Sequence, residues 1–181
     1  FAGITSCDDQ QPPPKPSEIV ELPSLLNPKT TELILGRLGY AAAHQGKIDD
    51  TTRLHEEELV RSLYPANAPK RLWSDDQAWK PYADSLYDLL THAENFGLFP
   101  SDYHYRDIKG VWNKLKDSAS LPDAALWSRG EVLLSDAFIH MARHLKWGRI
   151  GRDSLTLRTD TAFGAPEILA LLARVRGGEP V

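Results

Sequence analysis

Apolar residues recur every three or four positions through most of the chain, and this spacing is typical of amphipathic α-helices. The first periodic segment runs from Pro28 to Gly46, and the second runs from an expected helix cap at Asp50 to Pro65. Four further helices are predicted over residues 81–97, 101–118, 122–148 and 166–177. The pattern therefore predicts an all-α protein, with a single compact domain of about six helices.

The helix predicted over residues 81–97 carries the clearest signals at its two ends. Pro81 suits the first helical position, because its missing N–H group would have no partner there in any case. Gly97 suits the left-handed position after a helix, with Leu98 folding back on the last turn. The sequence therefore predicts both the start and the end of this helix.

Two segments lie outside the helical pattern. Residues 67–80 lack a helical period, and we expect a loop there that Trp73 and Trp79 anchor. The alternation typical of a strand occurs only in the short segment 153–159, DSLTLRT. Strands are therefore expected to contribute little to the fold.

The N-terminal residues differ from the rest of the chain in composition. Residues 8 to about 27 are rich in Pro, Asp and Gln, and they predict an extended linker because each proline fixes its φ angle and removes a backbone donor. We therefore expect residues 1–27 to form a start and linker, and residues 28–181 to form the helical domain.

Composition and charge argue against several classes of function. The chain has a formal charge of −4 and no basic block, so a nucleic-acid partner is not indicated. It contains no run of about eighteen apolar residues that could cross a membrane. Neither a nucleotide-binding loop nor a serine-nucleophile motif is present, and no cofactor is expected.

The segment LLSDAFIHMARHLKWGR, within the predicted helix 122–148, contains two histidines four positions apart. Asp136, His140 and Arg143 fall on the face opposite the apolar stripe, and His144 lies at its border. The apolar stripe itself consists of Leu134, Ala137, Phe138, Met141, Ala142 and Leu145.

A metal site on Asp136, His140 and His144 is one interpretation of this helix, and it is the least favoured. It would need a further ligand from another helix, and the HExxH motif of zinc enzymes is absent. We instead expect Asp136 and His140 to form a pair on a solvent-facing surface. The acidic run 56–58 is likewise expected to lie on a solvated helix face. The remaining histidines are scattered without partner spacing: His44, His55, His92 and His104.

Cys7 is the single cysteine of the chain. The stretch Ile4-Thr5-Ser6-Cys7 resembles the lipobox of bacterial lipoproteins, in which the cysteine is lipidated and becomes N-terminal. The proline-rich residues that follow suit a tether between a membrane and a folded domain. The sequence therefore predicts a lipid anchor at Cys7.

Three segments together carry a resemblance to a known family: LYPANAPKRLWSDDQAW, LYDLLTHAENFGLFPSDYHYRDI and LLSDAFIHMARHLKWGRI. From about residue 50 to residue 176, the chain resembles the N-terminal scaffold domain of the large YcbB-type L,D-transpeptidases. The middle segment, with its Gly-Leu-x-Pro-x-Asp-Tyr-His pattern, is the most specific of the three. The matching positions include Trp73, Gly97, Pro100, Asp102, Tyr103, His104, Asp136, Phe138, His144 and Gly148.

The resemblance implies a protein of the bacterial periplasm that takes part in peptidoglycan cross-linking. In such enzymes a cysteine in a separate C-terminal domain forms an acyl-enzyme with a donor stem peptide. The motif around that cysteine is absent from this sequence, so no catalytic residue is assigned, and peptidoglycan would be met through the parent protein. We expect the scaffold region of a longer enzyme. The alternative is a stand-alone envelope protein that binds a partner protein or peptidoglycan.

Overall fold

The computed structural model describes residues 13–149 and 164–177, and it confirms the predicted all-α fold. The α-helices of the described residues are α1 (Leu26–Ala43), α2 (Glu57–Leu63), α3 (Pro81–Thr91), α4 (Tyr105–Lys114), α5 (Ala124–Trp147) and α6 (Ala165–Arg176). Short 3-10 helices are η1 (Pro23–Leu25), η2 (Ala93–Phe96) and η3 (Pro100–Tyr103). The sheet found in these ranges is a hairpin of β1 (Ser74–Asp75) and β2 (Ala78–Trp79).

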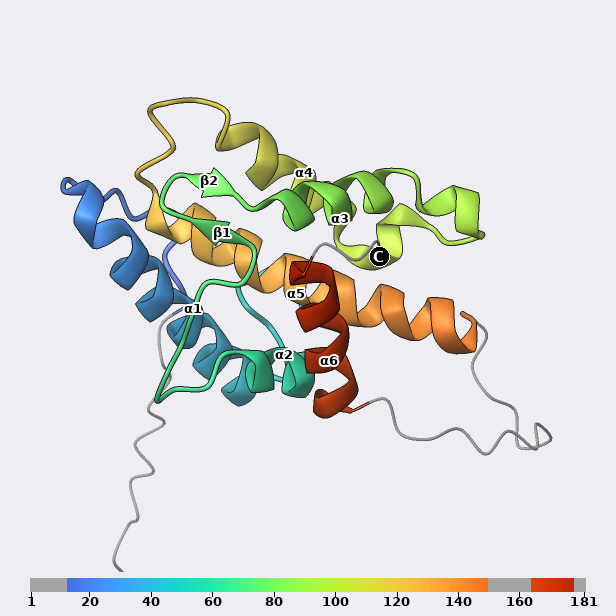
Figure 1. The fold of residues 1–181 in the computed structure, drawn as a ribbon. Coiled ribbons are helices and arrows are strands. Elements are labelled where there is room, and N and C mark those ends of the chain that lie inside the picture. Colours follow the sequence, from blue (N-terminus) through green and yellow to red (C-terminus); the bar gives the residue numbers. More distant parts are fainter. Residues whose placement is uncertain (1–12, 150–163, 178–181) are drawn as a thin grey trace, which may run out of the picture.

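Helix α5 runs through the middle of the molecule (Figure 1). Helices α1 and α2 pack along one side of it, and α3 and α4 pack along the other. From Ala124 to Ile139, every residue of α5 except Arg129 is buried. Because the helix is covered on all sides, any polar side chain on this part of it needs a partner inside the protein.

The start and the apolar face of α5 agree with the predicted helix 122–148. The Asp123 carboxylate caps the helix by accepting hydrogen bonds from amide groups of the first turn, and Gly148 follows the last turn with a φ of +84°. Met141 is buried, as the stripe predicts, but Leu145 is 47% exposed. The prediction for Leu145 is wrong because this residue lines an open apolar groove with Leu89, where α3 and α5 do not close over it.

The segment 67–80 is anchored by its two tryptophans, and residues 74–79 within it form the hairpin where a loop was expected. Trp73 is fully buried, and its indole N–H donates to Ser135 Oγ at 2.8 Å. Trp79 stacks on Trp112 of α4 with ring centroids 4.4 Å apart. A Cβ atom on Gly130 of α5 would lie 2.6 Å from the Trp79 ring, so this packing requires glycine there.

The expected start of α3 is confirmed, and its end is more elaborate than predicted. Pro81 is the first helical residue, but the α-helix ends at Thr91 and the short helix η2 continues the chain. Gly97 then adopts the left-handed conformation with a φ of +70°, and the Leu98 N–H donates to the carbonyl of Ala93. The predicted terminal motif therefore ends η2 instead of α3.

Helix α2 begins at Glu57, so the expected cap at Asp50 is wrong. The neighbouring Asp49 instead accepts hydrogen bonds from the amide groups of Thr51 and Thr52. These bonds close a local turn, which competes with helix formation in this stretch.

Helix α4 begins at Tyr105, so the expected cap at Ser101 is also wrong. The intervening residues form η3, which starts with Pro100. His104 separates the two helices because it has a φ of +55°, a left-handed conformation that cannot continue a right-handed helix.

The described part of the N-terminal segment lies against the start of α5. The Ser17 hydroxyl and the Glu18 N–H both donate to the Asp123 carboxylate, at 2.7 and 2.9 Å. The Val20 N–H donates to the Pro122 carbonyl at 2.9 Å. Residues 17–20 are therefore extended, as a linker would be, but they are hydrogen-bonded to the helical domain.

Two of the sequence predictions lie outside the described residues: the lipidated Cys7 and the strand-like segment 153–159. Among the helices of residues 13–149 and 164–177, none combines the length and the apolar character that crossing a membrane requires.

Candidate functional site

Glu131 is a fully buried carboxylate in the middle of α5. Its oxygens accept hydrogen bonds from the backbone N–H groups of residues 72, 73 and 74, at 2.8, 3.0 and 2.7 Å. The hydroxyls of Ser74 and Tyr64 also donate to it. These donors satisfy a charge that would otherwise be very unfavourable in the core. Glu131 therefore fixes residues 72–74, which lead into the hairpin, onto α5.

The charge of Glu131 affects the pKa values of two further buried groups, Arg71 and Tyr64. The Arg71 guanidinium lies 4.0 Å from the Glu131 carboxylate, and burial lowers the pKa of Arg71 although Glu131 acts in the opposite direction. Burial, and then the charge of Glu131, raise the pKa of the Tyr64 phenol well above its usual value. Tyr64 therefore stays protonated and remains a hydrogen-bond donor.

Asp136 is the second buried carboxylate of α5, and the prediction that it faces solvent is wrong. It accepts hydrogen bonds from the N–H groups of His55 and Glu56, at 3.0 and 2.8 Å. The His104 imidazole Nε2 lies 2.8 Å from Asp136 Oδ2, the same oxygen that accepts from the His55 N–H. The helical pattern identified the face opposite the apolar stripe correctly, but the segment before α2 and the η3–α4 junction cover that face in the folded protein.

The expected pair of Asp136 with His140 is replaced by contacts to Glu56. His140 Nδ1 lies 3.0 Å from Glu56 Oε1, and Arg143 donates to the other oxygen of the same carboxylate. The Glu56 side chain is only 9% exposed, so the first residue of the acidic run 56–58 is not part of a solvated face. Glu58, two positions on, is exposed as predicted.

Four histidines gather beside these carboxylates, although the sequence showed no spacing that relates them. The His55 ring stacks on His140 at 4.4 Å between centroids, and it lies 4.9 Å from the His104 ring. The His140 and His144 rings are 4.3 Å apart. The Tyr103 hydroxyl and His144 Nδ1 form a hydrogen bond of 2.8 Å. The interpretation of His55 and His104 as isolated residues is therefore wrong.

Two histidines of this cluster, His55 and His144, have lowered pKa values, which favour the neutral imidazole. Burial lowers the pKa of His55, and Asp136 opposes this effect. Burial, reinforced by His140, lowers the pKa of His144. The remaining histidines, His44 and His92, contact carbonyl groups of their own helices.

Most positions that carry the family resemblance meet on α5. Besides the contacts of His104 and Tyr103, the ring of Trp73 packs against Phe138 at 5.5 Å. Arg149 donates to Asp102 at 2.7 Å. The other matching positions shape the backbone: Gly97 ends η2, Pro100 begins η3 and Gly148 ends α5.

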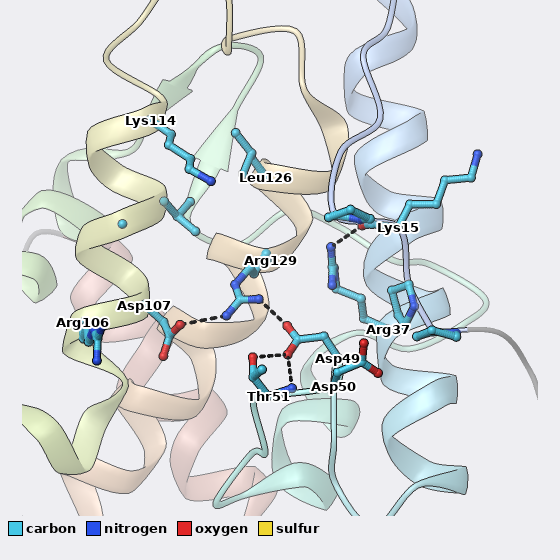
Figure 2. A pocket seen from close by; sticks show the side chains of 15 residues that line it. Lys15, Arg37, Asp49, Asp50, Thr51, Arg106, Asp107, Lys114, Leu126 and Arg129 are labelled. Carbon is cyan, nitrogen blue, oxygen red and sulfur yellow. Dashed lines mark hydrogen bonds and ion pairs between the residues drawn. The ribbon is translucent and has the colours of Figure 1, made fainter.

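A cavity of about 630 Å³ opens between α4, the start of α5 and residues 13–16 (Figure 2). Arg129 of α5 lies at its centre, between Asp49 and Asp107, and forms ion pairs with both (Figure 2). Lys114 extends towards the cavity from α4 (Figure 2). No motif in the sequence singled out this cavity, because its lining comes from five separate segments.

The groups around the cavity are strongly charged. Burial, and then the charge of Arg129, lower the pKa of Arg37 to about 10, and its guanidinium donates to Ser128 Oγ at 3.0 Å. Burial alone would raise the pKa of Asp49, but Arg129 and hydrogen bonds from Thr51 outweigh it and lower that pKa. The cavity therefore holds cations and carboxylates side by side, which suits a ligand with charges of both signs.

The fold and its buried contacts define a structural domain, in which one central helix holds distant segments together. Comparison with known families agrees, because the family model described as Scaffold domain matches residues 58–180, more than half of the chain. The chain belongs to the Scaffold domain family. No curated protein and no solved structure matched the chain.

Proposed function

We propose that this chain is the scaffold region of a bacterial cell-envelope protein of the L,D-transpeptidase type. Its role would be to support the catalytic and peptidoglycan-binding modules of the parent protein during peptidoglycan cross-linking. The observation that carries the proposal is the pair of buried carboxylates on α5, Glu131 and Asp136. Through them, α5 holds segments that are 57 to 81 residues away in sequence. A domain whose distant segments are joined by buried hydrogen bonds is suited to keeping other modules in a fixed orientation.

Under this proposal the parent protein acts in the periplasm, and Cys7 carries a lipid anchor. The hydrogen-bonded residues 17–20 would then connect the anchor to the start of α5. Mass spectrometry of the protein from its own host should find the lipid mass on Cys7. A processed protein with an unmodified Cys7 would contradict the anchor and leave the scaffold role untouched.

The experiment for the main proposal uses the complete parent protein and muropeptides with tetrapeptide stems. The expected result is the formation of cross-linked products, and meropenem should suppress it. The matched control replaces the cysteine of the catalytic domain with serine, which should abolish the products because the acyl-enzyme cannot form. A folded parent protein with a complete catalytic domain and no cross-linking activity would refute the proposal.

The cavity of Figure 2 favours a second candidate, a non-enzymatic module that binds peptidoglycan. Lys114 and Asp50 lie on its wall, so the carboxylates and amine of a stem peptide could each meet an opposite charge. Purified sacculi should then pellet the wild-type protein and release the Lys114→Glu variant. Lys109→Glu, on the same helix but outside the cavity wall, is the matched control. Equal pelleting of both variants would argue against this candidate.

A further inference from the structure

Three metal-binding side chains converge from segments that are far apart in the sequence. His55 precedes α2, His104 lies at the junction of η3 and α4, and Asp136 lies on α5. One donor atom from each side chain lies within 4.8 Å of the other two. Two imidazoles and one carboxylate form a donor set that suits zinc and related transition-metal ions.

We propose that His55, His104 and Asp136 form a binding site for one zinc-class divalent ion. Bond lengths of about 2.0–2.2 Å in a tetrahedral site place the donor atoms about 3.4 Å apart. The donor atoms lie within 4.8 Å of one another, and rotation of the exposed His55 side chain can bring them to this separation. A water molecule would supply the fourth ligand on the exposed side of His55.

The buried part of the site is held in place by the protein itself. Asp136 is fixed by the N–H groups of His55 and Glu56, which are contacts of the kind that orient metal-bound carboxylates. The proposed ion would bind between Asp136 Oδ2 and His104 Nε2, which lie 2.8 Å apart. In the tautomer with its proton on Nδ1, His104 offers the Nε2 lone pair, and the ion takes the place of this hydrogen bond.

The backbone at His104 provides an independent reason to assign a role to this residue. Its φ of +55° is unfavourable for a side chain with a Cβ atom, and such strain is found preferentially at functional positions. This conformation ends η3 and allows the His104 side chain to reach Asp136. The neighbouring His55 ring stacks on His140 with centroids 4.4 Å apart, which places it beside His104 and Asp136.

The test is calorimetric titration of zinc sulfate into the full chain, freed of any histidine tag and treated with EDTA. We expect one ion per chain, and at least a tenfold loss of affinity in His55→Ala. This variant keeps the backbone N–H that Asp136 needs, so it should stay folded. His92→Ala, which removes an exposed histidine at the end of α3, should bind as the wild type does.

A second readout separates the proposed site from the adjacent histidine pair. Cobalt(II) should give the intense visible absorption of a tetrahedral site in the wild type and in His144→Gln, but not in His55→Ala. The proposal is overturned if the wild type binds no stoichiometric ion, or if His55→Ala binds as tightly as the wild type. It is also overturned if His144→Gln alone abolishes binding, because the ion would then lie on the His140 side of the cluster.

Discussion

At the scale of single residues, Glu131 and Asp136 present the same physical problem and solve it in the same way. A carboxylate without partners in the apolar interior is strongly disfavoured. Each of these two side chains avoids that cost because backbone N–H groups from other segments point at it. The hydrogen bonds that satisfy the charge are also the ones that hold those segments in place.

Replacement of Glu131 by glutamine tests this point. The amide group of Glu131→Gln offers one oxygen and two donors, so at least one backbone N–H among residues 72–74 loses its acceptor. We expect the free energy of unfolding to fall by about 2–4 kcal/mol, as read from the urea midpoint. The exposed Glu94→Gln is the matched control and should change stability by less than about 0.5 kcal/mol. Equal midpoints for the two variants would contradict the role of Glu131.

At the scale of elements, residues 124–139 of α5 are covered by other parts of the protein on every side except at Arg129. Its apolar stripe packs in the core, and its opposite face is covered by the segment before α2. The two faces differ in chemistry, because one makes apolar contacts and the other makes hydrogen bonds and ion pairs. Substitutions on the two faces should therefore have very different effects.

Met141 and His140 are neighbours in sequence and form a matched pair for testing this difference. Met141→Asp places a charge without partners in the core, and we expect a loss on the order of 4 kcal/mol or more, enough to unfold the domain. His140→Ala removes a contact to Glu56, which keeps its ion pair with Arg143, so we expect a loss of about 1 kcal/mol or less. Thermal melts followed by circular dichroism will rank the two variants. The reverse order would require a different role for His140.

At the scale of the whole molecule, the histidine cluster couples folding to pH. Burial and the nearby His140 lower the pKa of His144 below its usual value of 6.5. Asp102 and Glu56 act in the opposite direction, and Arg149 acts in the same direction as burial. The unfolded chain therefore binds a proton at this position more readily than the folded protein does.

The sign of the pH dependence follows from this difference. The stability that neutral His144 contributes is fully present above pH 6.5, and it is lost as the pH falls below 6.5 through the lowered pKa of the folded protein. Urea unfolding in EDTA between pH 7.5 and about 5 should show decreasing stability. His144→Gln should reduce this slope, and His92→Gln is the matched exposed control. An unchanged slope in His144→Gln would show that other groups carry the dependence.

The sequence by itself determined the helical class of the fold, the core face of α5 and several terminal motifs. Pro81, Gly97 and Met141 behave as predicted because their roles depend on local backbone preference or on the helical period. The starts of α2 and α4 were predicted wrongly. Local turns, such as the one around Asp49, and the left-handed His104 compete with the helical pattern there.

Only the tertiary structure decided what surrounds the polar face of α5. A helical period shows which residues lie opposite the core, but it contains no information about a second layer of chain that covers them. The contacts of Asp136 with residues 55, 56 and 104 join positions that are 32 to 81 residues apart. For the same reason the histidine cluster and the cavity around Arg129 were not predicted, since their side chains meet only when the segments pack on α5.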